Sequence, residues 1–258
     1  TLKQLKMFSE KNNMGENYSV LKDIPYGNHE RHKIDIYIPE NPQKNSGVIL
    51  LIHGGGWSNG DKSDYKNEAE FYASSGYICV TMNYRFVSEN VNVFHELEDI
   101  TSVLSTIKGK CEEYGFDVKN TILTGASAGA HLSLLYAYTR KCEAPIIPVA
   151  VGAFCPPVNC WAENFLMGIK GEFEDWKYGV LSNCCGVKIT KDTLLNETQQ
   201  KALEKMSPQI YVSKECVPTA VFQGVLDELV PFEHSEIFID SLTKASVKND
   251  FLVYENSG

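Results

Sequence analysis

The sequence predicts an α/β fold, in which a mostly parallel central sheet is covered by helices on both faces and carries a cap-like insertion. Apolar runs of strand length alternate along the chain with segments of helical periodicity, a pattern typical of parallel sheets. The chain has 258 residues, 43% hydrophobic and 22% charged, which suits a single domain over residues 1–258. The alternation fails between residues 155 and 207, so this stretch is predicted to be the insertion.

The first part of the chain supplies an antiparallel pair and the first buried strands. Tyr18–Ile24 and His32–Ile38 are expected to pair, because isoleucine occupies every second position at the end of the latter. Gly47–Ile52 is a short apolar run, typical of a strand buried on both faces. Asn67–Ser75 is predicted as a helix that ends where a glycine follows, and Tyr77–Met82 as a second buried strand.

The remaining elements continue the alternation. Val93–Tyr114 has apolar residues at helical spacing, which predicts a helix with one face on the sheet. Thr121–Thr124 is predicted as a strand, Ala128–Arg140 as a helix and Val149–Phe154 as a strand. After the insertion, the expected elements are a strand, a helix and a last strand, at Thr219–Gln223, Phe232–Lys244 and Asp250–Tyr254.

The composition excludes several classes of protein. The balance of apolar and charged residues argues against a disordered chain. No apolar run approaches the roughly 20 residues that a membrane helix needs, so no membrane span is expected. The formal net charge of −9 argues against a nucleic-acid partner, because phosphate binding requires clustered Lys and Arg.

The eight cysteines do not form a metal-binding pattern. None stands in a C-x-x-C pair, and the six histidines are not at zinc-finger spacing. We therefore expect no metal and no cofactor. Free thiols in a reducing compartment are the preferred interpretation and disulfides the alternative. The protein is accordingly expected to be cytoplasmic, although a chain that begins at Thr1 also fits a removed leader.

Two motifs carry the chemistry. Gly125–Gly129 reads G-x-S-x-G between a predicted strand and a predicted helix, the context of a nucleophile elbow with Ser127 as nucleophile. The alternative is a glycine-rich turn with Ser127 as helix cap. His53–Trp57 reads HGGGW directly after a buried strand, and its glycines allow two N–H groups to converge on one point. A phosphate-binding turn is a weaker interpretation, because no Gly-Lys-Ser/Thr follows. His53 is expected to brace this loop rather than act as a base.

Together these motifs resemble the α/β-hydrolase fold, and within it the HGGG-type esterases related to hormone-sensitive lipase and to acetyl-xylan and feruloyl esterases. Further matches lie at Gly60–Lys62, where the family has G-D-K, at Glu113–Asp117, which precedes the strand of the nucleophile, and at Ser207-Pro208. Asn83-Tyr84-Arg85 departs from the family's D-Y-R in its first residue. The resemblance covers about residues 18 to 258 and is least specific in the insertion.

The resemblance implies roles for individual residues. Ser127 would be the nucleophile, and the N–H groups of Gly55, Gly56 and Ala128 would form the oxyanion hole. The acid of the triad is expected in the segment Gly224–Pro231, at Asp227. The neighbouring Glu228 is the alternative, one residue off the pattern. Where the family often has histidine before this segment, the chain has Gln223, a departure not expected to affect the triad.

The triad histidine is expected just after Gly258, because the family has it in a loop after the last strand and this sequence reads Tyr254–Gly258 there. The C-terminal end is therefore expected to be missing; the alternative is a chain without the base. An existing histidine in that role is a weaker alternative. His131 is expected to be structural, and His29, His32, His95 and His234 could reach the site only by an unusual geometry.

The expected function is that of a serine carboxylesterase that hydrolyses short-chain acyl esters through an acyl-enzyme. Its substrate would be a small-molecule or oligosaccharide ester, such as acetyl or feruloyl esters of carbohydrates. Trp57 and the aromatic residues of the insertion would form an acyl or sugar surface, or else pack in the core. The alternatives are an arylformamidase-type amidase and a non-catalytic binding protein of the same fold. The insertion's large side chains are Trp161, Phe165, Met167, Phe173, Trp176 and Tyr178.

Overall fold

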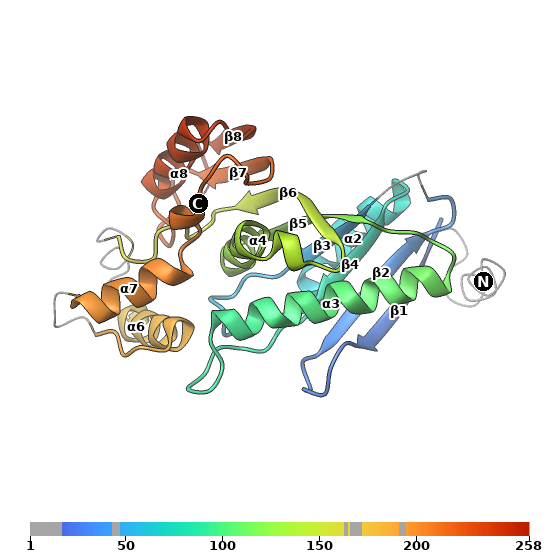
Figure 1. The fold of residues 1–258 in the computed structure, drawn as a ribbon, viewed down its shortest axis with the longest axis horizontal. Helices are drawn as coiled ribbons and strands as arrows, with labels where there is room; N and C mark the ends of the chain where they lie inside the picture. The colour runs from blue at the N-terminus through green and yellow to red at the C-terminus, as the bar shows by residue number, and fades with distance from the viewer. Residues whose placement is uncertain (1–16, 43–46, 163–164, 166–171, 191–194, 258) are drawn as a thin grey trace.

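The computed structural model describes residues 17–42, 47–162, 165, 172–190 and 195–257. It contains an eight-stranded sheet in the order β1-β2-β4-β3-β5-β6-β7-β8 (Figure 1). β1 pairs antiparallel with β2, and β2 pairs antiparallel with β4. All other neighbours are parallel, so the predicted mostly parallel sheet is confirmed. The strands are β1 Tyr18–Pro25, β2 Lys33–Pro39, β3 Val48–Ile52, β4 Ile78–Met82, β5 Asn120–Ala126, β6 Ile147–Phe154, β7 Thr219–Gly224 and β8 Asn249–Tyr254.

The centre of the sheet determines where the functional loops meet. β3 and β4 consist wholly of buried residues, as expected for apolar strands covered on both faces. β3 lies between β4 and β5. In the β3–β5 register, Ile52 is the partner of Gly125. The HGGGW loop after β3 and the G-x-S-x-G turn at the end of β5 therefore lie side by side at the carboxyl-terminal ends of these two strands.

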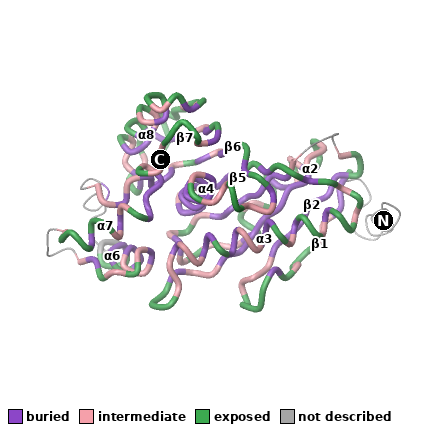
Figure 2. The backbone as a smooth tube through the Cα atoms, viewed as in Figure 1, coloured by how far each residue is buried: buried purple, intermediate pink, exposed green. Residues whose placement is uncertain are grey.

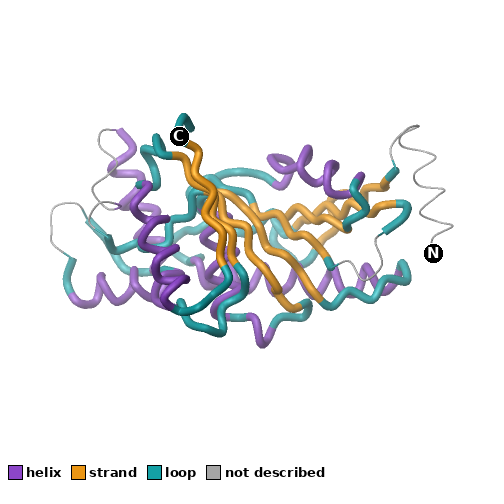
Figure 3. The backbone as a smooth tube through the Cα atoms, turned by 90° about the horizontal axis from the view of Figure 1, so that it is seen from above, coloured by secondary structure: helices purple, strands orange, loops and turns teal. Residues whose placement is uncertain are grey.

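Helices cover both faces of the sheet, as Figure 3 shows. α2, Lys66–Ser74, buries Ala69 and Ala73 against one apolar cluster with residues of β2, β3 and β4. A larger cluster contains the buried residues of three further helices, α3, α4 and α8. These helices span Val93–Glu113, Ala128–Thr139 and Phe232–Lys244.

Local sequence signals explain where two of these helices begin or end. Asn92 caps α3 by accepting hydrogen bonds from the N–H groups of Phe94 and His95, and His95 Nδ1 accepts from the N–H of Asn92 in return. After α2, Gly76 has φ 91°, a conformation that glycine adopts without steric cost. α4 is buried from Ala128 to Ala137, and the part of the backbone around it in Figure 2 is largely purple.

The segment between β6 and β7 interrupts the alternation of strands and helices. Within its described residues it contains the α-helices α6 Glu172–Cys185 and α7 Glu197–Met206 and the short 3-10 helix η3 Pro208–Tyr211, and no strand. The helices α6 and α7 lie beside each other in Figure 1. Met167 lies outside the described residues. None of the helices in the described part of the chain combines the length and apolar character needed to cross a membrane.

Candidate active site

The G-x-S-x-G turn holds Ser127 in a conformation that non-glycine residues seldom adopt. β5 ends at Ala126, α4 begins at Ala128, and Ser127 between them has φ 52° and ψ −118°. Such backbone strain costs on the order of 1–3 kcal/mol and occurs mainly at functional sites. The N–H of Ser127 donates to the carbonyl oxygen of Phe154 at 2.8 Å, and its own carbonyl accepts from the N–H of His131 at 2.9 Å. The turn is thus fixed on both sides, with Ser127 partly exposed.

The glycines of this turn are required by close packing. A Cβ atom at Gly125 or at Gly129 would run into the carbonyl oxygen of Ile52 at the end of β3. At Gly54 a Cβ would lie 3.0 Å from the carbonyl oxygen of Ala126. The start of the HGGGW loop therefore packs directly against the nucleophile turn.

The HGGGW loop is curled tightly beside Ser127. Gly55, Gly56 and Trp57 all have positive φ, at 102°, 58° and 57°. The carbonyl of Gly55 accepts hydrogen bonds from the N–H groups of Ser58 and Asn59, at 3.2 and 2.9 Å. This curl turns the backbone of Gly55 and Gly56 away from an extended path. Together with the N-terminus of α4 at Ala128, it forms the candidate oxyanion hole.

His53 braces this loop, as the sequence led us to expect. Its side chain is fully buried, and Nδ1 lies 2.7 Å from the carbonyl oxygen of Gly54. Burial is the main cause that lowers the pKa of His53 below its usual value, and the nearby positive charge of Arg31 adds to the effect. The ring is therefore neutral near pH 7 and donates its Nδ1 proton to the loop.

Asp227 lies in the loop after β7, and backbone N–H groups of the same loop hold its carboxylate. One carboxylate oxygen, Oδ1, accepts hydrogen bonds from the N–H groups of Leu229 and Val230, both at 2.9 Å. The other oxygen, Oδ2, accepts from the amide of Gln223 at 3.3 Å. Glu228 is exposed, whereas Asp227 is partly buried. The geometry therefore favours Asp227 over Glu228 as the acid.

Gln223 has a role that sequence reasoning missed. It is fully buried at the end of β7, and its amide also donates to the carbonyl oxygen of Val230 at 3.2 Å. Its Oε1 accepts from the hydroxyl of Ser235 at 2.8 Å. Gln223 thereby ties the Asp227 loop to the first turn of α8. The sequence signal that could have indicated this role is Gln223 itself, which stands where the family often has histidine.

Cys155 was also missed. It follows β6 with φ 43°, and its N–H donates to the carbonyl oxygen of Phe222 at 2.8 Å. The pKa of its thiol is raised to about 11, first by burial and then by the charge of Asp227 and a hydrogen bond to it. The neutral thiol is thus a neighbour of the candidate acid, and no sequence motif points to this contact.

Trp57 belongs to the core. Its side chain is 5% exposed, and Nε1 donates to Nδ1 of His131 at 3.1 Å. His131 in turn donates from Nε2 to the carbonyl oxygen of Met206, 2.7 Å away, and burial lowers its pKa to about 4. Of the two alternatives for Trp57, the structure therefore favours packing over a substrate surface.

Among the aromatic residues of the insertion, Trp176 of α6 lies against the HGGGW loop. A Cβ atom at Gly56 would come within 2.5 Å of Cη2 of the Trp176 ring, so the indole rests directly on this glycine. Trp176 is nonetheless 43% exposed. One part of its ring covers the candidate oxyanion loop and the rest remains accessible.

The other histidines are engaged elsewhere. His95 caps α3, and His32 lies 3.3 Å from Asp99 through Nε2. His29 accepts a hydrogen bond from the N–H of Arg31. His234 is buried on α8, with its ring 5.3 Å from that of Phe165. None of these four histidines was expected to serve as the base, and His131 has the structural role expected of it. Within the described ranges, no cluster of three or more His, Cys, Asp or Glu side chains could hold a metal ion.

Comparison with known proteins places this geometry in a family. The BD-FAE family model matches residues 34–242, well over half of the chain. The chain is 25% identical over 247 residues to "Probable isoprenylcysteine alpha-carbonyl methylesterase ICME" of Oryza sativa subsp. japonica, covering 92% of this chain and 57% of the relative. It is 27% identical over 228 residues to "Probable carboxylic ester hydrolase LipM" of Mycobacterium tuberculosis, covering 87% of this chain and 52% of that protein. The chain therefore spans little more than half the length of these relatives.

Solved structures share the fold. Esterase B from Lactobacillus Rhamnosis superposes with a TM-score of 0.74 at 21% identity, covering 97% of this chain and 79% of its own. A truncated form of a carbohydrate esterase from gut microbiota gives a TM-score of 0.72 at 17% identity, covering 94% of this chain and 90% of its own. The predicted α/β-hydrolase fold is thus confirmed.

Proposed function

Because the chain belongs to the BD-FAE family and has the α/β-hydrolase fold, we propose that it is a serine carboxylesterase with Ser127 as nucleophile. The observation that carries this proposal is the strained turn of Ser127, held against the HGGGW loop at one edge of the sheet. A strained serine beside positive-φ glycines is what acyl transfer requires, since the nucleophile must be exposed and the oxyanion donors fixed in advance.

In the proposed reaction, Ser127 Oγ attacks the carbonyl carbon of an ester while a histidine takes its proton. The negative charge that develops on the carbonyl oxygen is stabilised by the N–H groups of Gly55, Gly56 and Ala128. Collapse of the tetrahedral intermediate expels the alcohol, which receives the proton from the histidine. Water then attacks the acyl-enzyme by the same route and releases the acid and free Ser127.

The base is proposed to be the histidine expected directly after Gly258, oriented by Asp227. The N–H of Leu226 donates to the carbonyl oxygen of Ser257 at 3.0 Å. Ser257 is therefore held beside the residue that precedes Asp227. A histidine next to Gly258 would start close to the acid that is proposed to orient it.

The proposed substrate is a short-chain acyl ester, such as an acetyl or feruloyl ester of a carbohydrate. The half-exposed indole of Trp176 against Gly56 supports this substrate class, because aromatic rings stack on both sugar and feruloyl groups. The helices α6 and α7 would then act as a cap over the site. The gut-microbiota neighbour named as a carbohydrate esterase is consistent with this substrate class.

The test is hydrolysis by the purified natural protein of p-nitrophenyl acetate, methyl ferulate and N-formylkynurenine. We expect turnover of the two esters and loss of that turnover in Ser127→Ala. Preference for N-formylkynurenine would instead favour the amidase alternative. No turnover of any of the three substrates would favour the non-catalytic alternative.

The cytoplasm, a reducing compartment, is the proposed location, because all eight cysteines are free thiols in the structure. Thiol titration of the denatured protein without reductant should then count all eight cysteines. Paired cysteines in that titration would contradict this location.

A further inference from the structure

Arg31 reaches the candidate oxyanion loop from a distant part of the chain. It lies in the turn between β1 and β2, whose bounds are Pro25 and Lys33. Its Nη2 donates to the carbonyl oxygen of Gly60 at 3.0 Å and lies 3.3 Å from Nε2 of His53. One guanidinium therefore contacts both the first residue of the loop and the glycine three residues after Trp57.

Two further contacts fix the plane of the Arg31 guanidinium. Nε donates to the carbonyl oxygen of Tyr84, just after β4, at 2.8 Å. The guanidinium carbon lies 3.6 Å from the centre of the Phe86 ring, in a cation–π contact. A planar group held by three hydrogen bonds and an aromatic face has little freedom to move.

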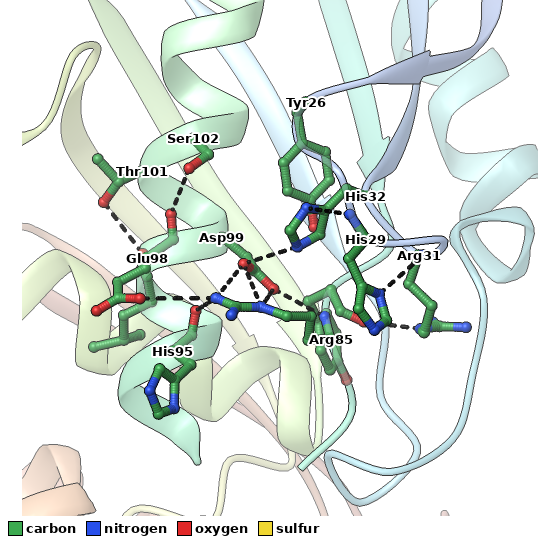
Figure 4. A network of polar contacts seen from close by, with 12 residues as sticks. Tyr26, His29, Arg31, His32, Arg85, His95, Glu98, Asp99, Thr101 and Ser102 are labelled. Atoms are coloured by element: carbon green, nitrogen blue, oxygen red, sulfur yellow. Dashed lines mark hydrogen bonds and ion pairs between the residues drawn. The ribbon is translucent and has the colours of Figure 1, made fainter. Parts of the chain in front are cut away.

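The hairpin that carries Arg31 is itself anchored. Figure 4 shows His32 of this hairpin directed at Asp99 of α3, with His29 and Arg31 beside it. Asp99 lies 2.7 Å from Nη2 of Arg85 and 3.3 Å from Nε2 of His32. The N–H of Arg31 donates to Nδ1 of His29 at 3.1 Å. The position of Arg31 is thus set by contacts that do not involve the loop.

The contact between Arg31 and His53 determines which ring nitrogen of His53 carries the proton. A guanidinium has only donors, so Nε2 of His53 must be the acceptor. In a neutral ring the proton then resides on Nδ1. Nδ1 lies 2.7 Å from the carbonyl oxygen of Gly54, to which it can donate only in this tautomer.

The tautomer sets the direction of an oxyanion donor. The carbonyl of Gly54 and the N–H of Gly55 belong to one planar, trans peptide group, so they point in opposite directions. Nδ1 of His53 donates to that carbonyl, and the Tyr84 hydroxyl shares its one proton between the carbonyl oxygens of His53, at 3.0 Å, and Gly54, at 3.3 Å. Hydrogen bonds that hold the carbonyl oxygen of Gly54 towards His53 therefore hold the N–H of Gly55 on the opposite side of the peptide group. A Cβ atom at Gly54 would lie 3.6 Å from Cβ of Ser127, so this peptide group is next to the nucleophile.

We propose that Arg31 is a positioning residue for the oxyanion loop: it holds His53 in the Nδ1–H tautomer and so fixes the peptide group that presents the Gly55 N–H. This role rests on the proposed function for its effect on turnover, but the link between Arg31 and His53 does not. No sequence motif indicates this contact, because 22 residues separate the two side chains.

The variants Arg31→Gln and Arg31→Lys test this role, with Arg140→Gln as the matched control. Arg140 directly follows α4 and its side chain is 40% exposed, so the same substitution there removes a positive charge at a site outside the oxyanion loop. For p-nitrophenyl acetate we expect kcat to fall about 10- to 100-fold in Arg31→Gln, with KM within about two-fold, because the donor is misplaced rather than removed. Arg31→Lys, which keeps one donor, should recover part of the loss, and Arg140→Gln should match the wild type.

The second readout is the ¹⁵N spectrum of the histidine rings, which distinguishes protonated from unprotonated nitrogens. His53 should show a single Nδ1–H tautomer in the wild type and a mixture in Arg31→Gln. His131, held as the Nε2–H tautomer by Trp57 and Met206, is the internal reference and should not change.

The two readouts separate the possible failures. An unchanged His53 spectrum in Arg31→Gln, or an altered spectrum with unchanged kcat, would overturn the positioning role. Absence of ester turnover in the wild type would instead overturn the proposed function, while the His53 spectrum would still decide whether Arg31 sets the tautomer.

Discussion

At the scale of single residues, the candidate site depends on glycines, at which a Cβ atom would not fit. Gly129 lies in the first turn of α4, where a Cβ atom would meet the carbonyl oxygens of Ile52 and His53. Those oxygens belong to backbone at the end of β3 and cannot move without displacing the HGGGW loop. The glycine is thus a requirement of packing between the two motifs.

Gly129→Ala should therefore destabilise the fold by about 1–3 kcal/mol, the range of overpacked cores. Gly109→Ala in α3 is the matched control, because a Cβ atom there meets nothing within 4 Å. The control should be neutral or stabilising by about 0.5–1 kcal/mol, since alanine favours helices over glycine. Urea unfolding of both variants measures the difference. Equal stabilities would contradict the packing account.

Asp227 and Glu228 are neighbours in sequence but differ in their surroundings. Asp227 is held by two backbone N–H groups and by Gln223, whereas Glu228 is exposed. Asp227→Asn should lower kcat for p-nitrophenyl acetate roughly 10³- to 10⁴-fold, because an amide favours the wrong histidine tautomer. Glu228→Gln, the matched control, should keep kcat within about two-fold. The opposite order of effects would reassign the acid to Glu228.

At the scale of elements, α6 is the part of the insertion that reaches the site. Its Trp176 rests on Gly56 of the HGGGW loop. Trp176→Ala should lower kcat/KM for methyl ferulate about five-fold, because an aromatic contact contributes about 0.5–1.5 kcal/mol. The same change should alter p-nitrophenyl acetate hydrolysis by less than about two-fold.

Phe71→Ala provides the control for this comparison, because Phe71 is an exposed aromatic residue on α2. It should leave both substrates unaffected. If Trp176→Ala also leaves the ratio of the two substrates unchanged, α6 does not contribute to substrate choice.

The elements themselves were largely predictable from the sequence. β3 and β4 were evident as apolar runs, and the predicted bounds of the last helix, Phe232–Lys244, agree with those of α8. Local patterns of this kind decide element type, since they reflect burial on one or two faces. The G-x-S-x-G motif likewise predicted the turn between a strand and a helix in which Ser127 lies.

Contacts between distant segments were not predictable. The approach of Arg31 to His53 and of Cys155 to Asp227 follows from the order and register of the strands, which single-sequence periodicity does not encode. Trp57 had two readings in the sequence, substrate surface or core. Its burial and its hydrogen bond to His131 decide for the core.

At the scale of the whole molecule, buried histidines make stability depend on pH. His131 is fully buried, and burial lowers its pKa from 6.5 to about 4. Between these two values the unfolded chain binds a proton that the folded chain does not bind. The contribution is therefore fully present above pH 6.5 and is lost as the pH falls towards 4.

The free energy of unfolding should accordingly fall on acidification from pH 6.5 to 4, with His131 contributing on the order of 3 kcal/mol. His131→Gln should show a shallower slope over this range in urea unfolding. His29→Gln, at an exposed histidine of the hairpin, is the control and should keep the wild-type slope. Identical slopes in the wild type and His131→Gln would contradict the assignment.

The central claim is that Ser127 is the nucleophile of an acyl-transfer site. The most direct test is the intact mass of the natural full-length protein after reaction with a fluorophosphonate, followed by peptide mapping. The account predicts one adduct per chain, located on Ser127 and absent from Ser127→Ala. No adduct on the folded protein, or an adduct that persists in Ser127→Ala, would contradict it.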